Sequence, residues 1–159
     1  MDFFVYHTVN QYNNLCVMSI RFSVQSGCFE LQNQDKVRRW IKSVVERRGK
    51  TVGNINYLFC DDEYLLKVNQ EYLNHDTYTD IITFDYVAGN LISGDIMISV
   101  DRVRDNAKQY GVSVEEELCR VIIHGVLHLL GQGDKSEADA LEMRRQEADA
   151  LQLFREEQF

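Results

Sequence analysis

The chain has 159 residues, 45% of them hydrophobic and 26% charged, and its formal net charge is −8 at pH 7. This length fits one domain, and this composition supplies one hydrophobic core, which excludes the disordered and fibrous classes. We expect residues 18–159 to form the single domain, and residues 1–17 to be an N-terminal extension or an added strand. No segment approaches the ~20 apolar residues of a membrane span, and the chain does not open like a signal peptide, so we expect a cytoplasmic protein without a membrane partner.

The negative net charge argues against a nucleic-acid partner, because contacts to phosphates need Lys and Arg side chains. The charge is unevenly distributed, however. Residues 1–60 carry 8 basic and 4 acidic side chains, and residues 61–159 carry 9 basic and 21 acidic ones. The basic surplus lies mainly between Lys36 and Lys50, and it is either an electrostatic footprint for an anionic partner or a solvated helix face.

Four cysteines are present, and no two of them form a C-x-x-C pair: Cys16, Cys28, Cys60 and Cys119. Cys60 and Cys119 lie in or beside apolar runs, where a reduced thiol packs as a small hydrophobic group. We therefore predict reduced, packed cysteines, with disulfides or thiol chemistry as the alternative.

The first expected element is a strand beginning at residue 19, because apolar residues alternate with polar ones there: Ile20, Phe22 and Val24. A turn follows near residues 26–27. The next element is a helix with Asp35 as its expected N-terminal cap and Gly49 as its end. Its apolar residues recur at the spacing of one helical face: Val37, Trp40, Ile41, Val44 and Val45.

The rest of the chain continues to mix strands and helices. We expect strands over about residues 54–60, 80–86 and 95–100. A helix is expected to start behind Asp61 and Asp62 and to reach about Leu73, and further helices are expected over about residues 101–110, 114–130 and 136–155. This order favours an α+β fold with a small, mixed four-stranded sheet covered by about five helices.

One short segment combines side chains that bind metal ions: His124-Gly-Val-Leu-His128-Leu-Leu-Gly131-Gln-Gly133-Asp134. Residues four apart lie on one face of a helix, so His124 and His128 can direct their imidazoles at one point. The two glycines allow the backbone to end the helix and turn back, which brings Asp134 to the position of a third ligand.

Three protein ligands are typical of catalytic zinc sites, which keep one position open, whereas structural sites are closed by four. A bound ion lowers the pKa of its water toward ~7, so this pattern predicts a hydrolase with a metal site at the end of one helix. Zn²⁺ is the expected ion, with nickel or manganese as alternatives.

Other interpretations fit this segment less well. A single helical histidine is usually packed or capped, but here two of the four histidines share the pattern. A zinc peptidase helix carries a glutamate after its first histidine, and Gly125 occupies that position. Two histidines and one carboxylate also occur in non-haem iron oxygenases, whose ligands usually come from strands.

The same residues resemble the YbeY family of endoribonucleases, whose signature is H-G-x-L-H-L-x-G-x-D-H. The match runs from His124 to Gly131, and a second match comprises Tyr72-Leu-Asn-His-Asp76, Thr79-Asp-Ile-Ile-Thr-Phe84 and Gly94-Asp-Ile96. The resemblance covers roughly residues 19–150. It implies a mixed sheet surrounded by helices and a metal-dependent endoribonuclease that prefers single strands, matures ribosomal RNA and acts in ribosome quality control. It also implies ribosomal RNA, the ribosome and its assembly factors as partners.

The resemblance assigns His124 and His128 to the first two metal ligands, and it aligns Asp134 with the third. The family usually has histidine at that third position, so the carboxylate lowers the charge of the site. Many relatives have an arginine where this chain has Leu73, which removes a candidate phosphate contact. The prolines that flank the second motif in many relatives are also absent.

Several further residues are candidates for the site. Asp80 and Asp95 are expected to orient ligands or water, with a structural role at a turn or strand end as the alternative. His75 is a candidate proton shuttle, although an exposed loop histidine is the common case. Arg120 is expected either to contact a phosphate or to form a surface salt bridge with Glu116 or Glu117. Three aromatic residues are candidates for base stacking, with core packing as the alternative: Tyr78, Phe84 and Tyr86.

The sequence thus predicts a metal-dependent endoribonuclease with His124, His128, Asp134, Asp95 and His75 as its catalytic residues. Two competing hypotheses remain open. One is a metallohydrolase that acts on another substrate, such as a phosphoester or a peptide. The other is a ribosome-associated binding protein whose metal only stabilises the fold.

Overall fold

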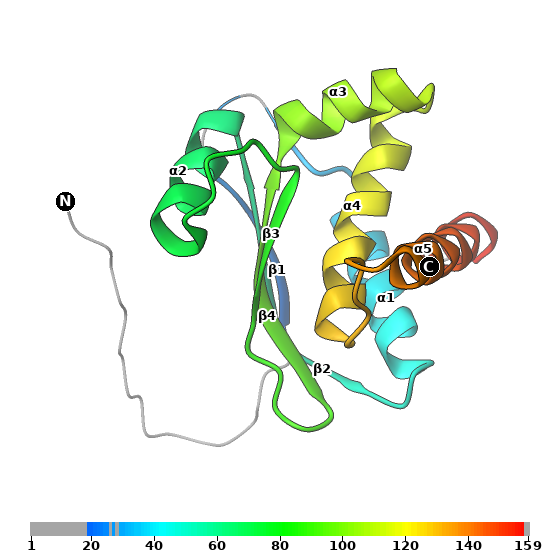
Figure 1. Cartoon of the computed structure of the whole chain (residues 1–159). Coiled ribbons are helices and arrows are strands. Elements are labelled where there is room, and N and C mark those ends of the chain that lie inside the picture. The colour runs from blue at the N-terminus through cyan, green and yellow to red at the C-terminus, as the bar shows by residue number, and fades with distance from the viewer. Residues whose placement is uncertain (1–18, 26, 28, 158–159) are drawn as a thin grey trace.

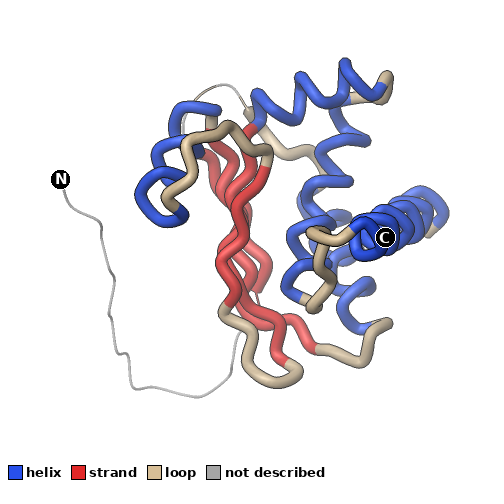
Figure 2. The backbone as a smooth tube through the Cα atoms, viewed as in Figure 1, coloured by secondary structure: helices blue, strands red, loops and turns tan. Residues whose placement is uncertain are grey.

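A four-stranded sheet forms the centre of the computed structural model, which describes residues 19–25, 27 and 29–157 (Figures 1 and 2). Its strands are β1 (Ser19–Val24), β2 (Thr51–Cys60), β3 (Ile81–Asp85) and β4 (Leu91–Ser99). They lie in the order β1-β2-β4-β3, with β1, β2 and β4 parallel and β3 antiparallel to β4. The predicted mixed sheet is confirmed.

Five helices surround this sheet in the described part of the chain: α1 (Gln34–Glu46), α2 (Asp62–Leu73), α3 (Val100–Tyr110), α4 (Val114–Leu129) and α5 (Glu137–Glu156). Helix α2 covers one face of the sheet, α1 and α4 cover the other, and α5 packs outside α4 (Figure 1). The predicted α+β class is therefore confirmed. None of the described helices has the length and apolar character that a membrane span requires.

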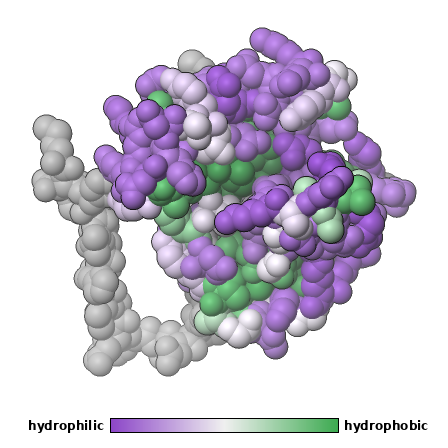
Figure 3. All heavy atoms as spheres, in the orientation of Figure 1, coloured by the Kyte–Doolittle hydropathy of each residue, from purple (hydrophilic) through white to green (hydrophobic). Residues whose placement is uncertain are grey.

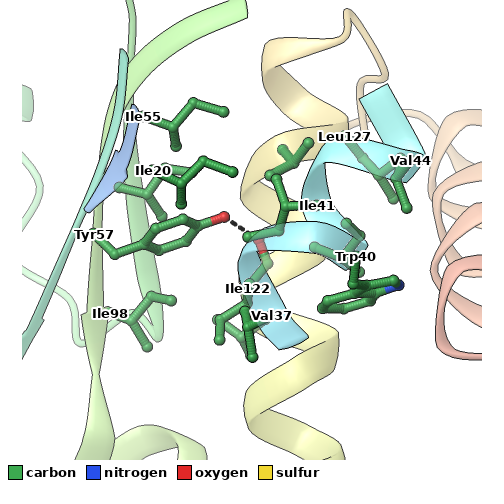
Figure 4. Packing of buried hydrophobic residues seen from close by; sticks show 14 of the residues in the cluster. Ile20, Val37, Trp40, Ile41, Val44, Ile55, Tyr57, Ile98, Ile122 and Leu127 are labelled. Atoms are coloured by element: carbon green, nitrogen blue, oxygen red, sulfur yellow. Dashed lines mark hydrogen bonds between the residues drawn. The ribbon is translucent and has the colours of Figure 1, made fainter. Parts of the chain in front are cut away.

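The main core lies between the sheet and helices α1 and α4 (Figure 4). Two buried side chains tie its layers together by hydrogen bonds. The hydroxyl of Tyr57 on β2 donates to the carbonyl of Ile122 on α4, at 3.1 Å. The indole Nε1 of Trp40 on α1 donates to the carbonyl of Ala150 on α5, at 2.8 Å. Because a polar group buried without a partner is costly, these two bonds fix how α4 and α5 pack.

Strands β2 and β4 both begin earlier than predicted, at Thr51 and Leu91. The added residues pair with each other, Thr51 with Leu91 and Val52 with Ile92, before a register shift. Gly53 lies in this irregular stretch, where a Cβ would come 2.1 Å from the Ser93 hydroxyl oxygen. Glycine resembles a turn signal in sequence, but here it permits a bulge and close strand contact.

The predicted cap of the first helix is wrong. Helix α1 begins at Gln34, and Asn33 precedes it in a left-handed conformation (φ 53°) without a side-chain cap. Asp35 lies within the first turn, where it accepts a 2.8 Å hydrogen bond from Arg38. The predicted end is confirmed, because the helix stops at Glu46 and Gly49 adopts φ 69°.

The described cysteines agree with the prediction of reduced thiols. Cys60 and Cys119 are both free, Cys60 is buried and Cys119 is half-buried. Burial raises the pKa of Cys60 to about 12 and that of Cys119 to about 11, so both remain protonated at neutral pH. Cys16, Cys28 and the predicted extension over residues 1–17 lie outside the described residues.

The substitution Gly94→Ala tests the close packing of β4 beneath α4. An added Cβ would lie 2.6 Å from the Phe84 carbonyl oxygen and 2.8 Å from a methyl carbon of Leu129. We expect this overpacking to lower the free energy of unfolding by about 1–3 kcal/mol, measured by urea titration of the metal-free protein. Gly133→Ala is the control, because its Cβ would meet ordinary contacts of 3.7 Å and should change stability by less than about 0.5 kcal/mol. Equal stability of the two variants would contradict this account.

Candidate metal centre

Helix α4 carries both predicted histidine ligands on the side that faces away from the core. The helix begins behind Ser113, whose hydroxyl accepts a hydrogen bond from the Glu116 amide at 3.1 Å. Gly125 allows the helix to approach the sheet closely, because a Cβ there would lie 3.0 Å from two side-chain carbons of Ile96. With Gly125 against the sheet, the neighbouring His124 and the residue one turn later, His128, reach the cleft beside it.

The chain reverses directly after α4 and brings Asp134 back to the histidines. Gly131 adopts φ 95°, and the Gln132 amide donates to the Leu127 carbonyl at 2.9 Å. The Nε2 atoms of His124 and His128 each lie 3.4 Å from the same oxygen, Oδ2 of Asp134. The predicted turn and the convergence of the three side chains are therefore present.

This arrangement fits a divalent ion. One ligand atom from each of His124, His128 and Asp134 lies within 4.8 Å of the others. A tetrahedral ion with ligands at about 2.0–2.2 Å separates its ligand atoms by about 3.3–3.6 Å, which matches the two 3.4 Å distances. The two imidazole planes are nearly perpendicular, at 85°, so each ring approaches the shared point from its own direction.

A buried carboxylate that the sequence analysis did not identify lies behind His124. Oε1 of Glu147 on α5 is 2.6 Å from the Nδ1 atom of His124, and only 6% of this glutamate side chain is exposed. Its position offered one signal. Glu147 falls between Met143 and Ala150 at helical spacing, on the buried face of α5 where an apolar residue is expected.

Arg120 connects this carboxylate to others. It lies 2.6 Å from Glu117, 3.3 Å from Glu147 and 3.6 Å from Asp80. Its hydrogen bonds to Glu117 raise the pKa of the guanidinium above its ordinary value. The predicted pair with Glu117 is confirmed, but it is not a surface pair because Glu117 is buried. Glu116 pairs with Arg155 instead, at 3.1 Å.

The candidate ligands open into a cleft of about 690 Å³, which is bordered by the α2–β3 loop, β3, α4 and the loop at residues 134–135. Figure 3 shows apolar surface between the α2 side and the α4–α5 side, with hydrophilic residues around it. The cleft also contains His75, Asp80 and Lys135. Thr83 lines it as well, and its buried hydroxyl has no hydrogen-bond partner among the described residues.

The structure does not bring every candidate residue to this cleft. Asp95 accepts a 2.9 Å hydrogen bond from the Asn56 amide and lines a separate pocket of about 290 Å³ beside α2. Side chains alternate between the two faces of a strand, and the neighbouring Ile96 packs against α4, so Asp95 points to the opposite face of the sheet. Asp80 reaches the cleft but contacts Asn106 and Arg120 rather than a histidine.

Two of the three aromatic candidates lie outside the core, whereas Phe84 is half-buried and packs against the smaller core cluster of Cys60, Leu65, Val68 and Ile82. Tyr78 and Tyr86 are 51% and 59% exposed, and both lie beyond the ends of β3. The Tyr78 hydroxyl donates to Glu63 at 3.0 Å. Phe84 and Tyr86 line the pocket with Asp95, on the face of the sheet away from the histidines.

The basic segment between Lys36 and Lys50 is placed on and after α1, and none of its residues lines the cleft. Several of its cations are engaged within the protein. Lys42 pairs with Glu46, Arg47 pairs with Glu157, and Lys50 donates to Asn90. This placement favours the predicted alternative of a solvated helix face.

The fold and the convergent side chains define a small α+β protein with an open candidate metal site on one helix. The sequence profile of the family described as Endoribonuclease YbeY matches residues 22–155. The Endoribonuclease YbeY of Flavobacterium johnsoniae is 56% identical over 130 residues, covering 82% of this chain and 94% of the relative. The Endoribonuclease YbeY of Porphyromonas gingivalis strain W83 is 56% identical over 120 residues, covering 76% and 80%. The chain belongs to the YbeY family.

A solved structure agrees with the fold. The solution structure of a Thermotoga maritima protein matches with a TM-score of 0.60 and 22% sequence identity, covering 86% of this chain and 89% of that one. At this identity the likeness concerns the fold alone.

The substitution His128→Ala tests the ligand set. Loss of a direct ligand should weaken Zn²⁺ or Co²⁺ binding by more than the ~10–100-fold that supporting residues contribute, measured by competition with a chromophoric chelator. His75→Ala is the matched control, because His75 lines the same cleft but is not one of the three convergent residues. Equal affinities of the two variants would contradict the assignment.

Proposed function

We propose that this protein is a zinc-dependent endoribonuclease that cleaves single-stranded RNA and acts in the maturation of ribosomal RNA. The observation that carries the proposal is the convergence of His124, His128 and Asp134 at the wall of an open cleft. Membership of the YbeY family supports RNA as the substrate, because the relatives are named endoribonucleases. On the basis of the same family membership, we also propose that the protein binds the ribosome and its assembly factors and acts in ribosome quality control.

Three of the described residues would bind the ion, and others line the cleft that would receive the RNA. His124, His128 and Asp134 would hold the ion, which supplies Lewis acidity that makes hydroxide available near neutral pH and offsets charge on the phosphodiester. Thr83 also lines the cleft, but its hydroxyl is buried and is not exposed to a substrate. His75 stays a candidate proton shuttle, since it lines the cleft from an exposed loop.

Lys135 is the cation in this cleft that we assign to the RNA backbone. It is exposed, follows the ligand Asp134 directly, and has no ion pair with any described residue. Arg120 also borders the cleft, but three carboxylates surround its guanidinium. Leu73 lines the cleft as well and cannot bind phosphate. Lys135 therefore supplies the free positive charge that a phosphate needs.

The geometry disfavours a peptidase, which is one form of the alternative metallohydrolase hypothesis. The general base of zinc peptidase helices follows the first histidine, and here that position is Gly125. A Cβ at Gly125 would contact Ile96 and Ile81 of the sheet, so a side chain there would point away from the cleft. An ion that only stabilises the fold would not explain why the three convergent residues line an open cleft.

Cleavage of an end-labelled single-stranded RNA tests the function. We expect cleavage by the metal-loaded protein, loss of cleavage after treatment with a chelator, and recovery when Zn²⁺ is added back. A duplex of the same sequence should be cleaved much more slowly, because the two strands hold its backbone in a helix. His128→Ala should remain inactive after Zn²⁺ is restored. Cleavage that survives chelation, or a wild-type protein that binds Zn²⁺ without cleaving RNA, would refute this proposal.

Lys135→Ala tests the RNA contact. If one phosphate contact is lost, affinity for single-stranded RNA falls, and the slope of log affinity against log salt decreases by about 0.7. The measurement is fluorescence anisotropy at several salt concentrations. Lys108→Ala is the control, because Lys108 is exposed on α3 and does not line the cleft. The same salt dependence in both variants would remove Lys135 from the RNA site.

A further inference from the structure

We propose that Glu147 is a positioning residue for the metal centre, which holds His124 in the tautomer that leaves its Nε2 atom free to bind the ion. This inference rests on the proposed function, because it assumes that His124 is a metal ligand. It goes beyond the ligand set by assigning a task to a carboxylate on a different helix.

The contacts of His124 carry the proposal. Its Nδ1 atom is 2.6 Å from Oε1 of Glu147, and its Nε2 atom is 3.4 Å from Oδ2 of Asp134. A carboxylate accepts hydrogen bonds, so Nδ1 is the nitrogen that carries the proton in this contact. In a neutral imidazole the other nitrogen, Nε2, then keeps its lone pair, and that nitrogen faces Asp134 and His128.

Glu147 is itself fixed by its surroundings. Its residue exposure is 4%, and Arg120 donates a 3.3 Å hydrogen bond to the same Oε1 atom that contacts His124. Arg120 is held in turn by two hydrogen bonds to Glu117, at 2.6 and 2.9 Å. The carboxylate therefore cannot rotate away without leaving a buried charge with fewer partners.

The local charges also favour a cation at this point. Glu117, Glu147 and Asp134 are carboxylates, and Arg120 is the single guanidinium that contacts two of them. Asp80 adds a further carboxylate at 3.6 Å from Arg120. The cluster is acidic overall. The negative charge of Glu147, which contacts His124, would therefore stabilise a cation bound by the histidines.

Two substitutions separate the parts of this role. Glu147→Met keeps a similar length but removes both the acceptor and the charge. Glu147→Gln removes the charge and keeps one acceptor oxygen. Asp149→Asn is the control, because Asp149 lies on the same helix, is exposed and pairs with Arg145 at 2.8 Å. Melting temperatures identify which variants are folded.

The first readout is the tautomer of His124 in the metal-free protein, from long-range ¹H–¹⁵N couplings of the neutral imidazole at alkaline pH. We expect the Nδ1–H form in the wild type and in Asp149→Asn. In Glu147→Met the balance should move toward Nε2–H, because the acceptor at Nδ1 is gone. A merely structural role for Glu147 would not change this ratio in a folded variant.

The second readout is the affinity for Zn²⁺ or Co²⁺. Loss of a supporting carboxylate should weaken binding about 10–100-fold in Glu147→Met, with a smaller loss in Glu147→Gln and none in Asp149→Asn. A folded Glu147→Met variant with unchanged affinity, or with an unchanged tautomer, would overturn the proposal. If that variant does not fold, unchanged affinity of Glu147→Gln would overturn it.

These outcomes are distinct from those that test the function. A wild-type protein that binds no metal would refute the proposed function and with it the metal-centre role of Glu147, and the tautomer measurement would still show whether Glu147 orients His124. A wild-type protein that binds metal and cleaves RNA, together with a Glu147→Met variant that matches it in both readouts, would refute only this inference.

Discussion

The close contact of α4 with the sheet is the constraint on which the remaining structure depends. Gly125 brings the helix against Ile81 and Ile96, and the hydrogen bond from Tyr57 to the Ile122 carbonyl fixes it along the strand direction. The same helix carries two of the three convergent side chains, and the turn that ends it delivers the third. The site is therefore as well defined as the packing of this one helix.

The carboxylate at Asp134 changes the charge of the centre relative to three histidines. Neutral imidazoles add no charge, so a divalent ion with Asp134 would carry a net charge of about +1 instead of +2. Arg120 does not restore the difference, because carboxylates on α4, α5 and the α2–β3 loop surround it. Lys135, adjacent to Asp134 and exposed in the cleft, is placed to do so. The candidate ligand Asp134 and the neighbouring cation Lys135 would thus set the charge of the site together.

The sequence predicted the convergence of the three candidate ligands because its geometry is local. His124 and His128 are one helical turn apart, and Asp134 follows after a short turn, so helix periodicity and glycine chemistry suffice. Glu147 escaped prediction because its contact with His124 depends on how α5 docks on α4. The face of the sheet on which Asp95 lies could not be predicted either. A shift of one residue in an expected strand reverses the side to which a side chain points. The early starts of β2 and β4 were missed because the glycines in them resemble turn residues.

The docking of α5 on α4 determines the orientation of His124, because Glu147 of α5 contacts its Nδ1 atom. Met143 and Ala150 bury the apolar face of α5, and the Trp40 indole binds the Ala150 carbonyl one turn beyond Glu147. A carboxylate in that face is costly unless charged or polar donors compensate for it, and both donors here, Arg120 and His124, belong to α4. The polar contacts of Glu147 with α4 are therefore fully satisfied only when His124 donates from Nδ1 and presents Nε2 to the cleft. For this reason ion binding at His124 should favour the docked arrangement of α4 and α5, which couples the stability of this helix pair to the metal.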